Sequence, residues 1–348
     1  MNPYVLAILL SSLGLGTTLT FASSHWLLAW MGLEINTLAI MPLMAQHHHP
    51  RAVEATTKYF LTQATAAATI LFASTTNAWT MGEWNIMDLS HPLATTMIMI
   101  ALALKIGLAP MHFWMPEVLQ GLDLLTGLIL STWQKLAPFA LIIQVAPTTN
   151  PLLLTSLGLL STLIGGWGGL NQTQLRKILA YSSIAHMGWM IIILQYTPQL
   201  TMIALGTYIL MTSTAFLTLK LASTTKINTL TTTWSKSPIL VTTTALAMLS
   251  LGGLPPLTGF MPKWLILQEL TKQDLPLTAT IMAMAALLSL YFYLRLCYAM
   301  TLTISPSTTN NYTPWRAQTT QTTLPLALST MTTLGLLPIT PAILALTT

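Results

Sequence analysis

Charge is the scarcest property of this sequence. Its 348 residues include only 8 acidic and 13 basic ones, so 6% of the chain is charged, whereas a soluble domain carries about 25% charged residues. So few charges cannot cover a water-facing globule. This excludes a soluble enzyme, a disordered protein and a nucleic-acid binder with a basic face. With 53% hydrophobic residues, the composition indicates a polytopic membrane protein.

Cysteine is nearly absent, because Cys297 is the single one in the chain. One cysteine excludes a disulfide framework, a cysteine-ligated zinc site and a self-contained iron–sulfur cluster. The sequence also lacks a G-x-G-x-x-G loop, a P-loop and a nucleophile elbow. No recognisable nucleotide-binding site is therefore expected in this chain.

Long apolar runs are what the sequence has in abundance. A helix of about 20 apolar residues crosses a bilayer core of about 30 Å. The runs are rich in Leu, Ala, Met and Ile and lack the period-2 alternation of a membrane barrel. We expect an all-α polytopic membrane protein with about eleven transmembrane helices. The predicted spans lie near residues 3–21, 25–45, 58–80, 93–114, 124–146, 151–170, 177–196, 199–222, 238–268, 276–301 and 322–346.

Loop charges predict the orientation of these spans. No cleavable presequence is expected, since an apolar run follows Met1 almost at once. The positive-inside rule places the N-terminus and the basic loops on the cytoplasm-like side, and an odd number of helices places the C-terminus opposite. Loops on the N-terminal side hold Arg51, Lys58, Arg176, Lys177, Lys226, Lys236 and Arg316, and loops on the other side hold Lys272 with Glu83, Asp88 and Asp274.

Two segments interrupted by Pro and Gly resemble each other, Lys105–Val118 and Leu251–Trp264. They lie five predicted helices apart, so two repeats would be inverted in the membrane, and inverted repeats with broken helices predict a transport site near the midplane. Two ordinary proline kinks are the alternative. We expect one transmembrane domain, 1–348, made of repeat one (1–146), repeat two (147–301) and a C-terminal loop and helix (302–348). At an offset of 146 residues the identical pairs are Gly107/Gly253, Leu108/Leu254, Pro110/Pro256, Met115/Met261 and Pro116/Pro262.

Five charged residues fall inside predicted spans: Glu34, Lys105, Lys135, Lys263 and Arg295. A charge at the bilayer centre costs at least ~2.5–3.5 kcal/mol, so such residues are usually paired or functional. Glu34 and Lys105 could form a static ion pair, and the other three could reach a helix end; Arg295 is best explained as structural. The functional interpretation is a proton relay, in which movement of Glu34 relative to Lys105 makes that lysine hold or release a proton.

The histidines leave two interpretations open. His112 follows the break in the fourth span and His186 lies inside the seventh, and each could relay protons or be a hydrogen-bonded core residue. The run His47-His48-His49 resembles a metal-binding tract but has no nearby partner ligands. We therefore expect no metal site there.

Four motifs resemble one known family. They are the opening Met-Asn-Pro, the helix Trp30-Met-Gly-Leu-Glu-Ile-Asn36, the segment Lys105-x-Gly-x-Ala-Pro-x-His-x-Trp-x-Pro-Glu117 and the segment Gly252-Gly-Leu-Pro-Pro-Leu-Thr-Gly-Phe-x-Pro-Lys263. Together they resemble the antiporter-like membrane-arm subunits of respiratory complex I, the mitochondrial NADH:ubiquinone oxidoreductase, in the animal form of its chain 2 family. The resemblance covers essentially the whole chain.

The resemblance implies specific roles for residues of this sequence. Glu34 would be the pairing carboxylate, Lys105 its partner, Lys135 the bridging lysine and Lys263 the lysine of the second broken helix. His112 and His186 are weaker assignments. The implied fold is two inverted five-helix units plus extra helices.

The resemblance also implies the setting. The chain would be a multi-pass protein of the mitochondrial inner membrane with its N-terminus in the matrix, translocating protons as quinone is reduced elsewhere. NADH, FMN, iron–sulfur clusters and ubiquinone would be bound by other subunits. Its partners would be antiporter-like chain 4, small chain 4L, accessory subunits and lipids such as cardiolipin, and no nucleic acid. The alternatives are a stand-alone cation/proton antiporter and a structural scaffold subunit.

Overall fold

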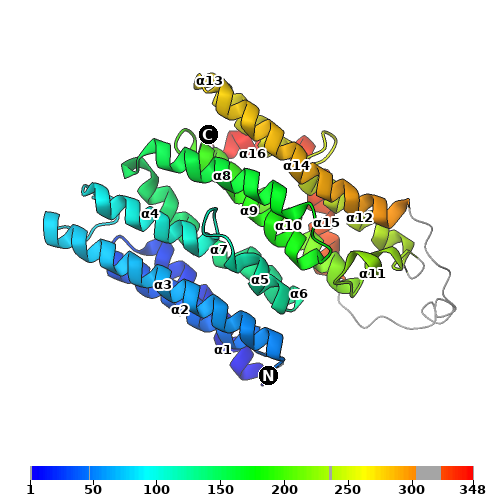
Figure 1. The fold of residues 1–348 in the computed structure, drawn as a ribbon, viewed down its shortest axis with the longest axis horizontal. Helices are drawn as coiled ribbons and strands as arrows, with labels where there is room; N and C mark the ends of the chain where they lie inside the picture. The colour runs from blue at the N-terminus through cyan, green and yellow to red at the C-terminus, as the bar shows by residue number, and fades with distance from the viewer. Residues whose placement is uncertain (1, 47, 235–236, 303–322, 348) are drawn as a thin grey trace. The chain divides into compact units, whose positions relative to one another are not determined.

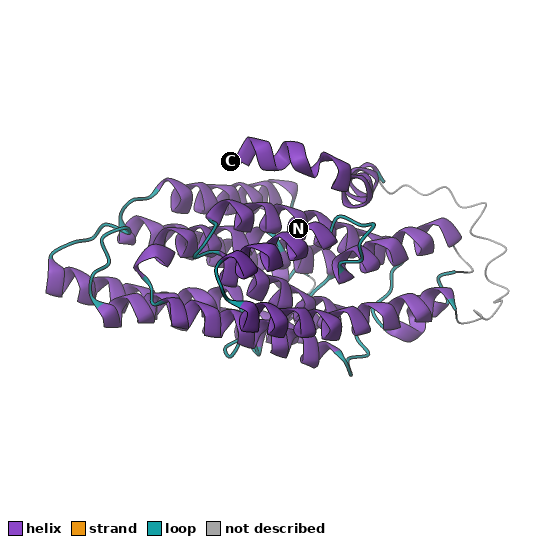
Figure 2. Ribbon diagram, turned by 90° about the horizontal axis from the view of Figure 1, so that it is seen from above, coloured by secondary structure: helices purple, strands orange, loops and turns teal. Residues whose placement is uncertain are grey.

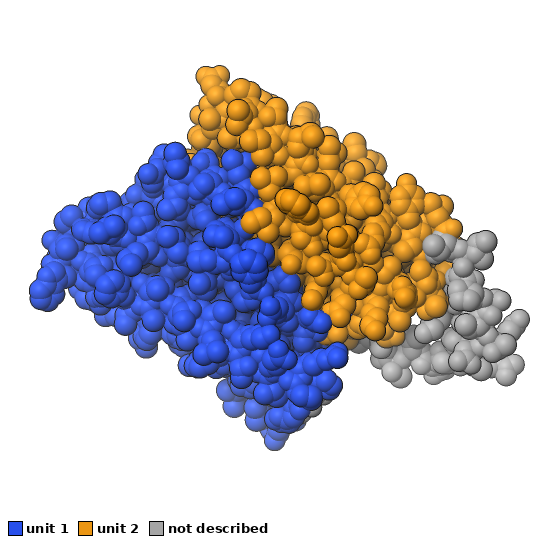
Figure 3. Space-filling model, viewed as in Figure 1, with its two compact units in different colours: residues 1–161 blue, residues 162–348 orange. Residues whose placement is uncertain are grey.

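The computed structural model describes residues 2–46, 48–234, 237–302 and 323–347. Within these ranges all the regular elements are helices, as Figures 1 and 2 show. The all-helical prediction is therefore confirmed for this part of the chain. Two compact units, Met1–Ser161 and Thr162–Thr348, are coloured separately in Figure 3.

The described residues of the first unit form seven α-helices and the start of an eighth. Helix α1 packs along α2, and α3 packs against α2, α4 and α5, while α7 contacts α1, α2 and α4. The helices are α1 (Pro3–Ala22), α2 (Trp26–Met44), α3 (Pro50–Met81), α4 (Pro92–Ile106), α5 (Trp114–Gly121), α6 (Leu124–Ser131) and α7 (Trp133–Val145), then the 3₁₀ turn Ala146–Thr148 and α8 (Pro151–Gly169).

The second unit begins within α8 and continues to α16. Helix α12 packs against α10 and α14, and α13 contacts α9, α10 and α14. The helices are α9 (Leu175–Ile193), α10 (Pro198–Leu221), α11 (Ile227–Thr231), α12 (Pro238–Gly252), α13 (Phe260–Lys272), α14 (Pro276–Thr301), α15 (Leu324–Gly335), the 3₁₀ turn Leu337–Ile339 and α16 (Thr340–Thr347).

Local chemistry explains where many helices begin. Proline occupies the first turn of α1, α3, α4, α10, α12 and α14, where its missing N–H would have no helical partner anyway. His49 and His91 precede two of these prolines and accept a backbone N–H from the first turn through Nδ1. The histidine run therefore serves in part as a helix cap, while His47 lies outside the described residues.

Six described segments are long and apolar enough to cross a membrane. Helices α4 and α12 are apolar but shorter, because both stop at a break. The segments are α1, α2, Leu124–Thr148, α8, α10 and α14. A polytopic membrane protein is thus the architecture that these residues form.

The two breaks have the same local geometry. Helix α4 ends at Gly107 with φ 85° and ψ 42°, and α12 ends at Gly253 with φ 80° and ψ 45°. These left-handed conformations suit glycine, which has no Cβ. Helices α4 and α12 start and end 146 residues apart, and so do the starts of α5 and α13.

Two predicted spans contain interruptions. In the span 124–146, Thr132 lies outside the helices and separates α6 from α7, within the apolar segment Leu124–Thr148 that is long enough to cross a membrane. The C-terminal span 322–346 is divided into α15, a 3₁₀ turn and α16. Glu117 lies in α5, where its carboxylate is 2.8 Å from the Lys58 amine.

Candidate functional site

Lys105 is the penultimate residue of α4, directly before the break. Its side chain is buried, and its Nζ has no hydrogen-bond partner among the described residues. The neighbouring carbonyl of Leu104 is already bonded to the Trp114 indole at 3.0 Å. The fold therefore places this amine in the interior without a direct partner.

Glu34 lies in α2. The same helix is joined to α3 by the indole of Trp30, whose Nε1 donates to the Ala67 carbonyl. The Glu34 Oε2 atom accepts from Thr37 Oγ1 at 3.3 Å, and its Oε1 atom is buried without a partner. Among the described residues, Lys105 Nζ and Glu34 Oε1 have no hydrogen-bond partner, so Glu34 and Lys105 form no direct contact pair there.

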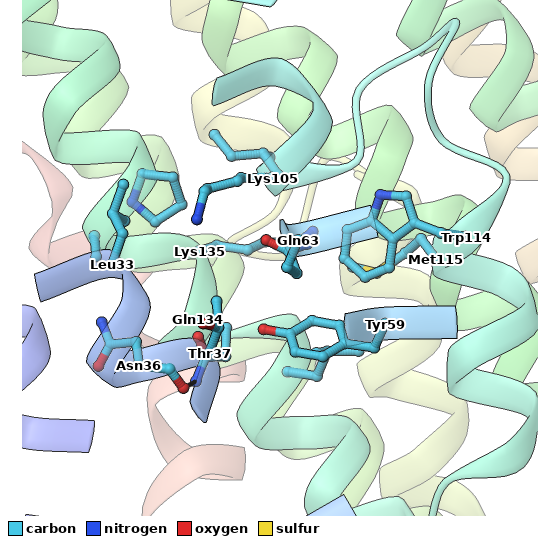
Figure 4. Close-up of a pocket in the computed structure, with 14 residues that line it drawn as sticks. Leu33, Asn36, Thr37, Tyr59, Gln63, Lys105, Trp114, Met115, Gln134 and Lys135 are labelled. Carbon is cyan, nitrogen blue, oxygen red and sulfur yellow. Dashed lines mark hydrogen bonds between the residues drawn. The ribbon is translucent and has the colours of Figure 1, made fainter. Parts of the chain in front are cut away.

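Lys135 lies in the first turn of α7, just after the Thr132 break, and is 3% exposed. It lines the same cavity as Lys105, which holds about 20 Å³ of space for water, and one water needs ~10–15 Å³. Figure 4 shows Lys105 entering this cavity from one side and the Tyr59 ring from the other. The lining includes Leu33, Asn36, Thr37, Tyr59, Gln63, Lys105, Trp114, Met115, Gln134 and Lys135.

Lys263 lies in the first turn of α13, and its Nζ donates to the carbonyl of Gly252, the last residue of α12, at 2.8 Å. Carbonyls at a helix C-terminus lack helical partners and carry partial negative charge, so they favour a cation. Lys263 lines a second cavity together with His186, with about 10 Å³ of space for water. His186 packs against Tyr208, with ring centroids 5.6 Å apart.

The structure thus gathers the predicted residues into two groups. Glu34, Lys105 and Lys135 belong to the first unit, and His186 and Lys263 share a cavity in the second. His112 lies between α4 and α5 with its Nδ1 3.2 Å from the Pro110 carbonyl, and it does not line the Lys105 cavity.

Arg295 has a structural role. Arg295 donates from Nη1 to the Leu170 carbonyl and so links α14 to the end of α8. No group of three or more His, Cys, Asp or Glu residues within the described ranges could hold a metal ion.

Sequence reasoning missed the uncharged polar residues of the first cavity. Asn36, Gln63 and Gln134 come from α2, α3 and α7, and Gln134 Nε2 donates to the Asn36 carbonyl at 3.3 Å. Amide side chains inside apolar spans could have indicated these residues from the sequence, because a polar group in a membrane span needs a hydrogen-bond partner.

Known proteins resemble this chain over its whole length. A family model described as "NADH:quinone oxidoreductase/Mrp antiporter, TM" matches residues 23–289, and one described as "NADH dehydrogenase subunit 2 C-terminus" matches residues 290–344. NADH-ubiquinone oxidoreductase chain 2 of Carassius auratus is 85% identical, with both chains fully covered. The Danio rerio protein of the same name is 78% identical, also over both full lengths.

Solved structures show the same fold. A chain of respiratory complex I from Thermus thermophilus matches with a TM-score of 0.85 and 30% identity, covering 97% of this chain and 79% of the other. A chain of the Mrp complex from Dietzia sp. matches with a TM-score of 0.84 and 16% identity, covering 96% and 75%, which shows the fold alone. The chain therefore belongs to the NADH:quinone oxidoreductase/Mrp antiporter transmembrane family, in its chain 2 branch.

Proposed function

We propose that protons cross this chain along a relay of buried side chains, Glu34, Lys105 and Lys135 in the first unit and Lys263 with His186 in the second. The chain is a core membrane subunit of respiratory complex I, an antiporter-like proton-translocating module. The relay is our assignment of that activity to particular residues. His112, beside the first break, is the sixth candidate.

The observation that carries the proposal is the cavity shared by Lys105 and Lys135. Two buried amines from different helices line one water-sized space, and Glu34 makes no direct contact with the Lys105 amine. A structural ion pair would place the charges in contact, whereas this arrangement leaves Lys105 available for proton exchange.

Glu34 would control the first lysine through distance. Two unit charges 4 Å apart attract by ~4 kcal/mol at an effective dielectric constant of about 20, and by about half as much at ~8 Å. Moving the carboxylate over that range would change the proton affinity of Lys105 roughly 30-fold. Quinone reduction in other subunits would drive that movement.

Lys263 would be the corresponding group of the second unit. Its bond to the Gly252 carbonyl stabilises the ammonium form. A change in the α12 break would weaken that bond and release the proton toward the cavity that His186 also lines.

We further propose about eleven membrane spans arranged as two inverted five-helix repeats, with repeat one at 1–146 and repeat two at 147–301. The equal spacing of α4 from α12, and of α5 from α13, supports the repeat. The matching left-handed glycines at the two breaks support it as well. The basic loops favour an N-terminus on the matrix side and a C-terminus on the intermembrane side.

The complex supplies the remaining chemistry. FMN, iron–sulfur clusters, NADH and ubiquinone would be bound by other subunits, consistent with the single cysteine of this chain. Antiporter-like chain 4, small chain 4L, accessory subunits and cardiolipin are the partners we propose.

The test is substitution in the assembled complex. Lys105→Met and Lys135→Met should each lower proton pumping per electron while quinone reduction continues. Lys272→Met is the matched control, because Lys272 is an exposed lysine at the end of α13, paired with Glu269. Unchanged stoichiometry in both cavity variants would refute the relay.

The same system tests the scaffold alternative. If Glu34 and Lys105 only hold helices together, replacing both with Leu should preserve pumping, since apolar pairs often substitute for buried charges. Loss of pumping in an assembled double variant would refute the scaffold. A stand-alone antiporter would purify as a single chain after mild solubilisation, and the relay predicts a large assembly.

A further inference from the structure

The loop between α12 and α13 is attached to α15 by a side-chain hydrogen bond. Thr258 Oγ1 donates to the carbonyl of Thr333 at 2.6 Å, across 75 residues of sequence. Both residues are buried, with Thr258 2% exposed and Thr333 1% exposed. Thr218, by contrast, donates to the Ala215 carbonyl within its own helix, α10. The Thr258 bond therefore joins two separate elements of the second unit.

Helix α15 offers this acceptor because of where the helix ends. Thr333 lies in the last turn of α15, which ends at Gly335, and the carbonyls of a last turn lack helical partners. Since a buried carbonyl needs a hydrogen-bond partner, the Thr258 hydroxyl satisfies this one. Helix α15 also packs against α10 and α12. It therefore braces both α12 and the loop that follows α12.

The loop transmits this constraint to Lys263. Gly259, next to Thr258, lies so close to the Ser250 carbonyl of α12 that a Cβ on Gly259 would overlap it. Gly259 also lines the cavity that Lys263 lines. Just beyond the loop, Lys263 Nζ donates to the Gly252 carbonyl. Because that bond joins the start of α13 to the end of α12, it depends on how the loop holds the two helices together.

The first break is joined by an uncharged donor. The Trp114 indole of α5 donates to the Leu104 carbonyl of α4 at 3.0 Å. At the same offset of 146 residues the second break has Phe260, which has no side-chain N–H to donate. Its joining donor is Lys263, the residue that the relay requires to exchange a proton. A joint that weakens at each exchange needs a second attachment, and Thr258 supplies one.

We propose that Thr258 is a positioning residue for proton translocation: its bond to the Thr333 carbonyl holds the α12–α13 loop so that Lys263 meets the Gly252 carbonyl. The inference rests on the proposed relay, in which Lys263 carries a proton. When Lys263 releases that proton, the neutral amine binds the carbonyl more weakly than the ammonium does. The Thr258 bond then keeps the loop in place until the proton is regained.

Thr258→Val in the assembled complex tests this role, because Val keeps the shape of the side chain and removes its donor. Thr218→Val is the matched control, since Thr218 is also buried in the second unit but donates within α10. The readouts are the distance from Lys263 Nζ to the Gly252 oxygen in a high-resolution map and the rate of quinone-coupled proton pumping. We expect Thr258→Val to lengthen that distance and slow pumping about two- to tenfold, the factor that one hydrogen bond contributes, with Thr218→Val unchanged.

Two further variants distinguish positioning from a purely structural effect. Thr258→Ser keeps the donor and should restore both the distance and the rate. In a Lys263→Met background, Thr258→Val should slow pumping no further, because a positioning residue acts through the lysine. A residue that only stabilises the chain would slow pumping in that background too. If Thr258→Val does not assemble, the smaller Thr258→Ala takes its place.

The outcomes separate this inference from the relay itself. A native map without the Thr258 bond, or an unchanged distance or rate in Thr258→Val, overturns the inference, and Lys263→Met still tests the relay. Further slowing in the Lys263→Met background overturns it as well. An unchanged rate in Lys263→Met alone overturns the relay role of that lysine, and this inference with it. A longer distance with slower pumping, both recovered by Thr258→Ser, supports the positioning role.

Discussion

The two left-handed glycines provide a matched experiment on how Lys263 is held. Gly107 and Gly253 end α4 and α12 with nearly identical backbone angles. A Cβ at Gly253 would lie 2.9 Å from Lys263 Nζ and 2.9 Å from its Cδ, closer than side chains tolerate. A Cβ at Gly107 would meet Trp114 at 3.4 Å, an ordinary contact. Alanine at the two positions therefore differs mainly in its effect on the lysine.

The magnitudes follow from these contacts. Alanine in the left-handed region costs about 1–2 kcal/mol, so both variants should be destabilised by about that amount. Gly253→Ala must also shift the end of the Lys263 side chain, whose amine donates to the Gly252 carbonyl at 2.8 Å. A hydrogen bond to a charged group contributes about 1.5–3 kcal/mol, so the total loss should lie between about 1 kcal/mol, if the bond re-forms, and about 5 kcal/mol, if it breaks.

The assay combines thermal unfolding of the assembled complex with proton pumping per electron in proteoliposomes. We expect Gly107→Ala to lower stability with little change in pumping, and Gly253→Ala to lower both. Equal pumping by the two variants would refute the reasoning that the Gly252 carbonyl positions Lys263. A Gly107→Ala variant with the larger loss would refute it as well.

The other predictions concern capping and surface charge. Arg295→Met should destabilise the chain by about 1.5–3 kcal/mol, because it removes the charged donor to the Leu170 carbonyl. Thermal unfolding measures this loss of stability, and Arg295→Lys should recover part of it. His91→Ala should cost about 1 kcal/mol, because the first turn of α4 loses its side-chain cap, and His91→Asn should restore it; a stable alanine variant would contradict this. The hydrogen bond and charge of Lys58 lower the pKa of Glu54. Their pairing therefore stabilises the fold at pH values above the ordinary Glu pKa of about 4.3, and this stabilisation is lost as the pH falls through the lowered pKa. Glu54→Gln should remove this acid-side loss when unfolding is measured over a pH series, and an unchanged series would contradict the prediction.

Much of this protein can be predicted from local sequence. Apolar runs specify membrane helices because a bilayer offers the backbone no hydrogen-bond partners. Helix starts at prolines and breaks at Gly107 and Gly253 are equally local, because φ preferences belong to single residues. The candidate lysines were also visible, because a charge inside an apolar run is costly enough to stand out.

Uncharged polar residues were harder to assign. Asn36 and Gln63 carry no charge signal, and their importance depends on which helices meet around them. The interruption at Thr132 was also not predicted, because hydropathy is averaged over many residues and does not report a single residue outside the helix.

The sequence by itself determined the class of protein, the helices and the short set of buried charges, because each depends on residues close together in the chain. Only the tertiary structure decided that Lys105 and Lys135 share a water-sized cavity, and that Lys263 bonds to the end of α12. The shared cavity depends on the packing of helices distant in sequence, and the Lys263 bond depends on how the chain folds back between α12 and α13. Distance and burial control the energy of a charge, and both arise only when the helices come together.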